Sequence, residues 1–233
     1  MTKKDNFILG AYVGLELILF LTIKVSEQFS VQRPLDIIRY SVIVCNFLMI
    51  TYLYLKYGRY LNSRENLIPL AFLFTLTADT FLCLINGIYI MGYFFFFVVE
   101  SVYMFYIGLT RRSVSARIIL YGALLFALWY TKMLTFTYAI AMANMAQLTV
   151  NVFCAWIKKS QIKSRETLLF ALGITLFFGC DFSILIRTIV TMPPIHSIAV
   201  FTVWTCYVPA QVFLLFSYVE KIRHAELQSI EIP

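Results

Sequence analysis

Eight apolar runs follow one another along almost the whole chain, and they limit its possible folds more than any other feature. They cover residues 7–23, 37–55, 67–89, 91–110, 118–131, 134–157, 167–190 and 196–219. A helix of about 20 apolar residues spans the hydrocarbon core of a bilayer and satisfies its own backbone hydrogen bonds there. Only 13% of the residues are charged, about half the share found in a soluble domain. The sequence therefore predicts an all-α, polytopic membrane helix bundle that forms one integral membrane domain over residues 1–233.

The breaks between the runs are short, and they differ in strength. Residues 56–66 and 111–117 are rich in charge, whereas only a tight turn at Met91–Gly92 separates the third run from the fourth. Only Lys132 divides the fifth run from the sixth, so seven spans are the alternative to eight. No small-residue cleavage pattern follows the first run, so we expect a retained first span rather than a signal peptide.

The basic residues divide unevenly between the two ends of the predicted bundle. With eight spans, fourteen of the 19 lysines and arginines lie on the side of the two termini and five lie on the other side. Because basic residues are enriched in cytoplasmic loops, this asymmetry predicts that both termini are cytoplasmic. The net charge of +7 follows from this topology and from attraction to anionic lipid headgroups, so we expect no nucleic-acid partner.

Three carboxylic acids lie well inside apolar runs: Asp79 in the third, Glu100 in the fourth and Asp181 in the seventh. An acid at the bilayer centre costs about 2.5–3.5 kcal/mol on insertion scales, so it usually faces a bundle interior and has a function. An acid held out of water also keeps its proton more readily, as an intramembrane proton donor requires. Glu16 in the first run is a fourth acid, which we expect to lack polar neighbours on its face of the helix.

Other polar residues share helical faces with these acids, because positions three, four and seven apart lie on one side of an α-helix. Taken singly, an amide in a span is typical of hydrogen bonding between helices. Together with three acids, four such stripes predict a polar chamber inside the bundle. The stripes are Thr75, Asp79 and Asn86; Glu100 and Tyr103; Asn144, Gln147 and Asn151; and Trp204, Tyr207 and Gln211.

The third and seventh runs are alike in a way that indicates a duplication. Both are predicted to start at the cytoplasmic face, and Asp79 and Asp181 stand 102 residues apart. Two parallel four-helix repeats, residues 1–110 and 111–233, would bring these two acids toward one central cavity. Coincidence between two apolar helices is the alternative.

Other charged and metal-binding residue types limit the kinds of functional site that this chain can form. Arg187 stands six residues beyond Asp181, about 9 Å along a helix, so we expect it at the non-cytoplasmic rim, snorkelling or binding a phosphate. Two distant histidines without an HxxxH or HExxH pattern argue against a catalytic zinc. The sequence also has no GxSxG, P-loop or GxGxxG motif, so we expect neither a metal nor a cofactor.

Four short motifs resemble those of the YhhN-like lysoplasmalogenase family of multi-span membrane proteins. Residues 78–82 (ADTFL) resemble its Gly-Asp-x-x-Leu motif with alanine in place of glycine, and Cys180–Asp181 resembles its Ser-Asp motif with the serine replaced. Residues 207–211 (YVPAQ) are similar to its closing Tyr-x-x-Ala-Gln, and residues 100–103 (ESVY) to its His-x-x-Tyr, with Glu100 in place of histidine. The similarity covers most of the chain, which would be a divergent member.

The resemblance implies hydrolysis of the vinyl ether bond of a lysoplasmalogen, a single-chain membrane lipid. That reaction needs one carboxylic acid to protonate a carbon and one carboxylate to stabilise the resulting cation, a division of labour found in glycosidases. We expect these two roles from Asp79 and Asp181. The residues expected to bind the substrate are Glu100, Tyr103, Asn144, Asn151, Arg187, Tyr207 and Gln211.

Two other functions are compatible with the same residues. Acids at mid-membrane in a duplicated bundle are also typical of a proton-coupled small-molecule transporter, although the loops are short and only Pro209 interrupts a span. The departures at Ala78, Glu100 and Cys180 favour instead a sensor or structural module that has lost its chemistry. Release of aldehyde from a lysoplasmalogen separates the hydrolase from both alternatives.

Overall fold

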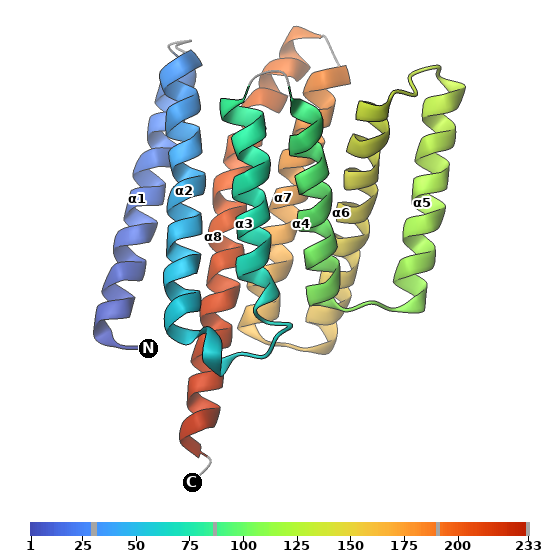
Figure 1. The fold of residues 1–233 in the computed structure, drawn as a ribbon. Coiled ribbons are helices and arrows are strands. Elements are labelled where there is room, and N and C mark those ends of the chain that lie inside the picture. Colours follow the sequence, from blue (N-terminus) through green and yellow to red (C-terminus); the bar gives the residue numbers. More distant parts are fainter. Residues whose placement is uncertain (29–31, 86–87, 190–191, 232–233) are drawn as a thin grey trace.

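Eight long helices run side by side in the computed structural model, which describes residues 1–28, 32–85, 88–189 and 192–231 (Figure 1). All eight are long and apolar enough to cross a membrane, and no strand occurs among the described residues. The protein is therefore an all-α, multi-pass membrane bundle, as predicted. The helices are α1 Lys3–Gln28, α2 Gln32–Tyr57, α3 Leu67–Asp79, α4 Tyr89–Ile107, α5 Arg111–Tyr130, α6 Phe136–Gln161, α7 Arg165–Ile189 and α8 Pro193–Glu231, with short helical turns η1 Gly58–Tyr60 and η2 Thr80–Leu84.

The boundary between α5 and α6 decides in favour of eight spans over seven. Lys132 has a left-handed backbone conformation with a φ of 57°. The amide of Lys132 donates to the carbonyl of Trp129, and the amide of Met133 donates to that of Leu128. This pair of hydrogen bonds is a Schellman motif, which ends a helix by satisfying its last carbonyl groups. α5 therefore ends at Tyr130, and residues 131–135 connect it to α6.

Both termini lie at the same end of the bundle, here called the termini end (Figure 1). The connections from α2 to α3, from α4 to α5 and from α6 to α7 lie at this end too. The placement of the termini end in the cytoplasm rests on the basic residues and stays a prediction. The duplication also stays a prediction, because α3 and α7 run parallel in any chain of eight helices that alternate in direction.

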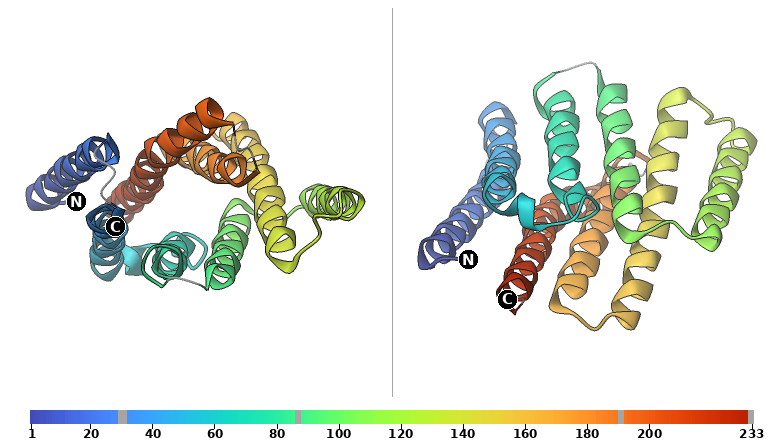
Figure 2. Two further views of the ribbon diagram at one scale, coloured as in Figure 1. Left: turned by 90° about the horizontal axis from the view of Figure 1, so that it is seen from above. Right: turned by 60° about the horizontal axis from the view of Figure 1, so that its bottom comes forward.

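Six helices form a closed arrangement, with α1 and α5 on its outside (Figure 2). α2, α3 and α4 follow one another along one side, while α6, α7 and α8 complete the other side. α1 contacts α2 and α8, whereas α5 contacts α6 and no other described helix. The side chains that point inward from α3, α4, α6, α7 and α8 therefore meet in the middle of the protein.

The turn expected at Met91–Gly92 is wrong, because both residues lie in the first turns of α4. A Cβ atom on Gly92 would lie 2.6 Å from the side chain of Leu82 in η2, closer than two carbon atoms approach without repulsion. Gly92 is thus a packing position that lets α4 approach the end of the third span. Glycine indicates a turn where the backbone requires its conformational freedom. At Gly92 the helix contact requires instead the small size of glycine.

Candidate functional site

Asp79 lies where the third span changes its helical form. α3 ends at Asp79, and the π-helix η2 begins at the next residue, Thr80. Short π-helical segments inside membrane and soluble helices occur frequently at functional sites. Asp79 is 6% exposed, and its carboxylate accepts a hydrogen bond from the hydroxyl of Tyr207 on α8. Thr80 shares a hydrogen bond of 2.9 Å with Tyr40 of α2, so three helices fix this position.

Asp181 faces the same interior from α7. Its charge interacts with that of Asp79 and with that of Glu100, and it makes no hydrogen bond to any described residue. One turn earlier on α7, the ring of Phe177 packs against the rings of Tyr207 and Phe96, with centroids 5.8 Å apart in each pair. The structure thus brings Asp181 into electrostatic range of both Asp79 and Glu100. These three residues are here called the interior acids.

Glu100 is 0% exposed on α4 and is held by one amide. Asn151 of α6 donates from Nδ2 to the Glu100 carboxylate over 2.8 Å and to its backbone carbonyl over 2.9 Å. The second carboxylate oxygen of Glu100, Oε1, has no hydrogen-bond partner in the described part of the chain. Asn151 in turn accepts a hydrogen bond of 2.5 Å from Nη2 of Arg117 on α5. A continuous polar chain therefore links α4, α6 and α5.

Arg117 is the residue of this chain that the sequence did not predict. We expected it in the charged break before the fifth span, yet it lies in the second turn of α5 and is only 5% exposed. A signal was available, because Arg117 and Tyr121 stand four residues apart, as do Gln147 and Asn151 on α6. Tyr121 donates to Gln147 over 2.7 Å, so the two polar stripes face each other in register.

Three further predicted residues are buried and carry polar atoms without a partner among the described residues. These atoms are the hydroxyl of Tyr103, both amide atoms of Gln211 and Oδ1 of Asn144. Asn144 also donates from Nδ2 to the carbonyl of Tyr93 over 2.9 Å, a contact between α6 and α4. A buried polar group left without a hydrogen bond costs about 1–3 kcal/mol, so each of these atoms has hydrogen-bonding capacity that a ligand would use.

Two predicted positions lie outside this description. The side chain of Arg187 and all of Asn86 fall outside the described residues, so their parts in the site stay predictions. Among the others, the structure joins Asp79 directly to Tyr207 and Glu100 directly to Asn151. The predicted roles of these residues in catalysis and substrate binding also stay predictions.

The YhhN family matches residues 39–218, more than three quarters of the chain. The chain belongs to the YhhN family. No curated protein and no solved structure matches the chain. The matched segment of this YhhN protein holds the three interior acids together with Arg117 and Asn151, whereas all of α1 lies outside it.

Glu16, on α1 of the YhhN protein, has polar neighbours that the sequence analysis did not foresee. Asn46 of α2 donates to Glu16 over 3.1 Å and accepts a hydrogen bond of 2.6 Å from Tyr12. Tyr12 precedes Glu16 by four residues and thus lies on the same helical face. The expectation that Glu16 lacks polar neighbours is therefore wrong. This small network joins two adjacent helices, which is the ordinary structural use of polar residues in spans.

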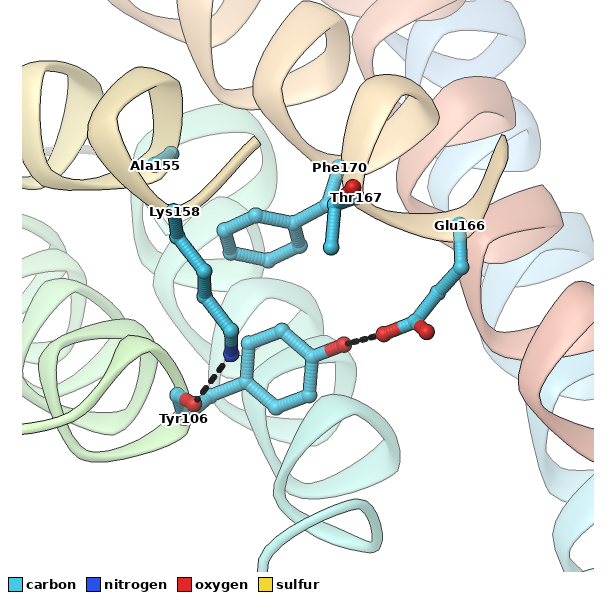
Figure 3. A pocket seen from close by; sticks show the side chains of 6 residues that line it. All are labelled: Tyr106, Ala155, Lys158, Glu166, Thr167 and Phe170. Atoms are coloured by element: carbon cyan, nitrogen blue, oxygen red, sulfur yellow. Dashed lines mark hydrogen bonds between the residues drawn. The ribbon is translucent and has the colours of Figure 1, made fainter. Parts of the chain in front are cut away.

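A narrow crevice lies between α4, α6 and α7, where side chains from the three helices approach one another (Figure 3). It is lined by Tyr106, Ala155, Lys158, Glu166, Thr167 and Phe170. The hydroxyl of Tyr106 donates to Glu166 over 2.9 Å, and Glu166 pairs with Lys221 of α8 over 3.0 Å. The crevice is thus crossed by contacts that hold α4, α7 and α8 together, and its charged groups already have partners.

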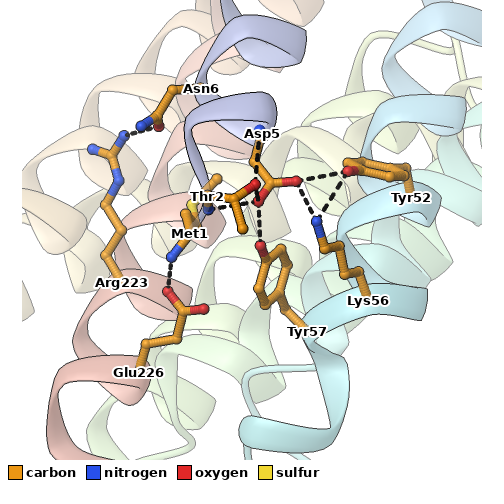
Figure 4. Close-up of polar contacts among 9 residues, drawn as sticks. All are labelled: Met1, Thr2, Asp5, Asn6, Tyr52, Lys56, Tyr57, Arg223 and Glu226. Carbon is orange, nitrogen blue, oxygen red and sulfur yellow. Dashed lines mark hydrogen bonds and ion pairs between the residues drawn. The ribbon is translucent and has the colours of Figure 1, made fainter. Parts of the chain in front are cut away.

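A second buried aspartate, Asp5 on α1, lies at the termini end (Figure 4). Its carboxylate is 0% exposed and accepts hydrogen bonds from four side chains. Tyr52 donates over 2.7 Å, Tyr57 over 2.5 Å and the ammonium group of Lys56 over 2.5 Å, while Thr2 donates from its hydroxyl over 2.7 Å. Asp5 therefore fastens the first helix to the second with all of its acceptor capacity in use.

Proposed function

We propose that the protein is an intramembrane hydrolase that cleaves the vinyl ether bond of a lysoplasmalogen-like lysophospholipid. The observation that carries the proposal is the position of Asp79 and Asp181. They come from different helices, interact electrostatically inside the bundle and form no ion pair with a described basic residue. Membership of the YhhN family and the motifs that hold both aspartates give independent support.

The reaction requires a proton donor and a nearby anion. One of the two aspartates, as the carboxylic acid, transfers its proton to the β-carbon of the vinyl ether, and the double bond becomes an oxocarbenium ion. The other, as the carboxylate, stabilises that cation and takes a proton from the attacking water. The hemiacetal then separates: the first aspartate, now a carboxylate, takes the proton of the new hydroxyl, and the second returns its proton to the ether oxygen that leaves. The products are a fatty aldehyde and the free hydroxyl of the glycerophospho-headgroup. One molecule of water is consumed, and both carboxyl groups return to their starting states.

The remaining polar residues suit the placing of a lipid next to the aspartates. Tyr207 fixes the orientation of Asp79 through its hydrogen bond. The unpartnered polar atoms of Tyr103 and Gln211 are available to bind hydroxyl and ether oxygens of the glycerol unit. Glu100 and Asn151 extend the polar surface toward the termini end, so the lipid headgroup would point that way and the aldehyde-forming chain would lie among apolar side chains.

Aldehyde release from a defined lipid tests the proposal. Purified protein in detergent is incubated with a C16 lysoplasmalogen, and fatty aldehyde is trapped and quantified by mass spectrometry. We expect release by the parent protein and almost none by Asp79→Asn, because an amide cannot donate the proton. If the parent releases no aldehyde from either choline or ethanolamine lysoplasmalogen, the proposed activity is wrong, and proton-coupled uptake in vesicles becomes the measurement to make.

A further inference from the structure

Arg117 is a buried cation that forms no ion pair with a described residue. The ion pairs among the described residues involve the basic groups of Met1, Lys24, Arg39, Lys56, Arg165, Lys221 and Arg223. Arg117 makes none. Its guanidinium donates to the carbonyl of Ser113 over 3.0 Å and to Asn151 over 2.5 Å, while Nε is buried and has no partner in the described residues.

A buried charge without a counterion destabilises the folded protein. The two other arginines near the start of α5 do not carry this cost. Arg111 and Arg112 are exposed and can meet water or lipid headgroups, whereas the guanidinium of Arg117 is enclosed. Charged groups inside a membrane protein are normally paired, because the cost of removing them from water is several kcal/mol. The arrangement therefore favours a bound anion, because Glu100 reaches Arg117 only through Asn151.

The geometry around Arg117 specifies what kind of anion fits. Asn151 stands between the guanidinium and Glu100 and bonds to both. On one side of this amide is a free donor, Nε of Arg117, and on the other a free carboxyl oxygen, Oε1 of Glu100. A ligand that bonds to both of these atoms has an anionic group for Arg117 at one end and, a few bonds away, a neutral polar group for Glu100.

A phosphate joined to a glycerol unit has this form. Guanidinium groups bind phosphate through two parallel hydrogen bonds, and the glycerol hydroxyl of a lysophospholipid, a few bonds from the phosphate, can donate to Oε1 of Glu100. The outer face of α5 exposes Ile118, Ile119 and Phe126, which suits contact with lipid chains. Arg117 lies in the second turn of α5, and α5 begins at the termini end. A lipid whose chain lies along this helix therefore has its headgroup near the one buried arginine of the described residues.

We propose that Arg117 binds the phosphate of a single-chain phospholipid, with the glycerol unit lying along Asn151 toward Glu100. The direction of the lipid relative to Asp79 and Asp181 rests on the proposed function, but the phosphate contact does not. Arg117 takes the role that we first expected of Arg187 at the opposite rim. The headgroup would then enter from the termini end.

Binding measurements with two lipids test this assignment without any hydrolysis. The probes are radiolabelled palmitoyl lysophosphatidylcholine, an acyl lipid without a vinyl ether, and monopalmitoylglycerol, which has the same chain and no phosphate. The protein is held in nanodiscs of neutral lipid, as the parent and as Arg117→Gln and Arg117→Lys. Arg112→Gln, which changes an exposed arginine of the same helix, is the matched control, and Arg187→Gln tests the other rim.

We expect Arg117→Gln to weaken binding of the phosphate-bearing lipid about 10- to 100-fold, the range of a hydrogen bond to a charged group, and to leave binding of monopalmitoylglycerol unchanged. Arg117→Lys keeps the charge without the paired donors and should lose less, which also covers failure of the Gln variant to fold. Arg112→Gln should match the parent with both lipids. A similar loss with both lipids, or a loss at Arg187→Gln alone, would overturn the assignment.

A measurement with inorganic phosphate distinguishes a phospholipid ligand from a free phosphate ion. If phosphate alone raises the Tm of the parent but not that of Arg117→Gln, the anion is free phosphate and the lipid assignment is wrong. The outcome for the hydrolase is distinct, because a parent protein that binds the lysolipid through Arg117 but releases no aldehyde defeats the proposed reaction and leaves the binding site standing.

Discussion

Asp5 and Asp79 are both buried aspartates that accept a hydrogen bond from a tyrosine, yet their surroundings are opposite. Asp5 receives four side-chain donors, one of them the ammonium group of Lys56. Among the described residues, Asp79 receives a side-chain hydrogen bond from the hydroxyl of Tyr207 alone, and it lies within electrostatic range of a second carboxyl group, that of Asp181. A carboxylate whose acceptors are all used holds helices together, whereas one without a cation keeps the capacity to exchange a proton.

The positions of the two residues in the fold explain this difference. Asp5 lies near the termini end, where the long side chain of Lys56 reaches it from α2. Asp79 lies at the change from α3 to the π-helix η2, and its neighbours come from α7 and α8. The YhhN match includes Asp79 and leaves out Asp5. A buried acid in a membrane protein therefore indicates a catalytic site only when its hydrogen-bond and ion-pair partners do not already satisfy it.

The largest expected effect is the loss of turnover when an interior aspartate becomes an amide. Asp79→Asn and Asp181→Asn should each reduce aldehyde release at least about 100-fold, the scale of general acid–base catalysis, with little change in Tm. The double variant should be scarcely worse than either single one, because residues that act as a unit are not additive. Full activity in both single variants would show that the two aspartates do not perform the chemistry.

Asp5→Asn should lower the stability of the protein and leave its activity unchanged, the reverse of the effect expected for Asp79→Asn and Asp181→Asn. The amide loses the charge that attracts Lys56 and cannot accept as many hydrogen bonds, so we expect the Tm to fall by about 3–10 °C. Activity per folded molecule should stay at the parent level. Thermal unfolding monitored by tryptophan fluorescence, together with activity below the transition, measures both quantities. A loss of activity without a loss of stability would end the distinction between the two aspartates.

Glu100→Gln should have an intermediate effect. Glutamine keeps the volume of the side chain and can still accept the hydrogen bond from Asn151, so the polar chain to Arg117 survives. We expect a reduction in turnover of about 10-fold, less than for either aspartate, if Glu100 positions the substrate. Initial rates at saturating lipid give the comparison, and a loss as large as that of Asp79→Asn would instead make Glu100 a proton-transfer residue.

Among the variants of the candidate site, Tyr207→Phe should have the smallest effect on activity. It removes one hydrogen bond to Asp79 and keeps the ring contacts with Phe177 and Trp204. A hydrogen bond of this kind contributes about 0.5–1.5 kcal/mol, so we expect turnover to fall roughly two- to twelvefold. Trp204→Phe, which leaves the hydroxyl in place, is the matched control and should retain more activity than Tyr207→Phe; the opposite order would assign the effect to packing.

The helices could be predicted from the sequence because hydrophobic length alone decides which segments cross a bilayer. Their polar contacts could not be predicted as well, since these depend on which helices become neighbours. Arg117 follows a cluster of basic residues and therefore resembled a loop residue, although its spacing from Tyr121 matches the stripe on α6. Gly92 resembled a turn because sequence does not distinguish a glycine needed for close packing from one needed for a bend.

The measurement that tests the central claim most directly is the isotopic composition of the aldehyde released in D2O. Protonation of the vinyl ether carbon by a carboxylic acid places one solvent-derived deuterium on the carbon next to the carbonyl group, and reduction with borohydride on release fixes it for mass spectrometry. We predict aldehyde with one deuterium from the parent protein and essentially none released by Asp79→Asn. Absence of aldehyde, aldehyde without deuterium at that carbon, or equal release by Asp79→Asn would contradict proton transfer by the interior acids.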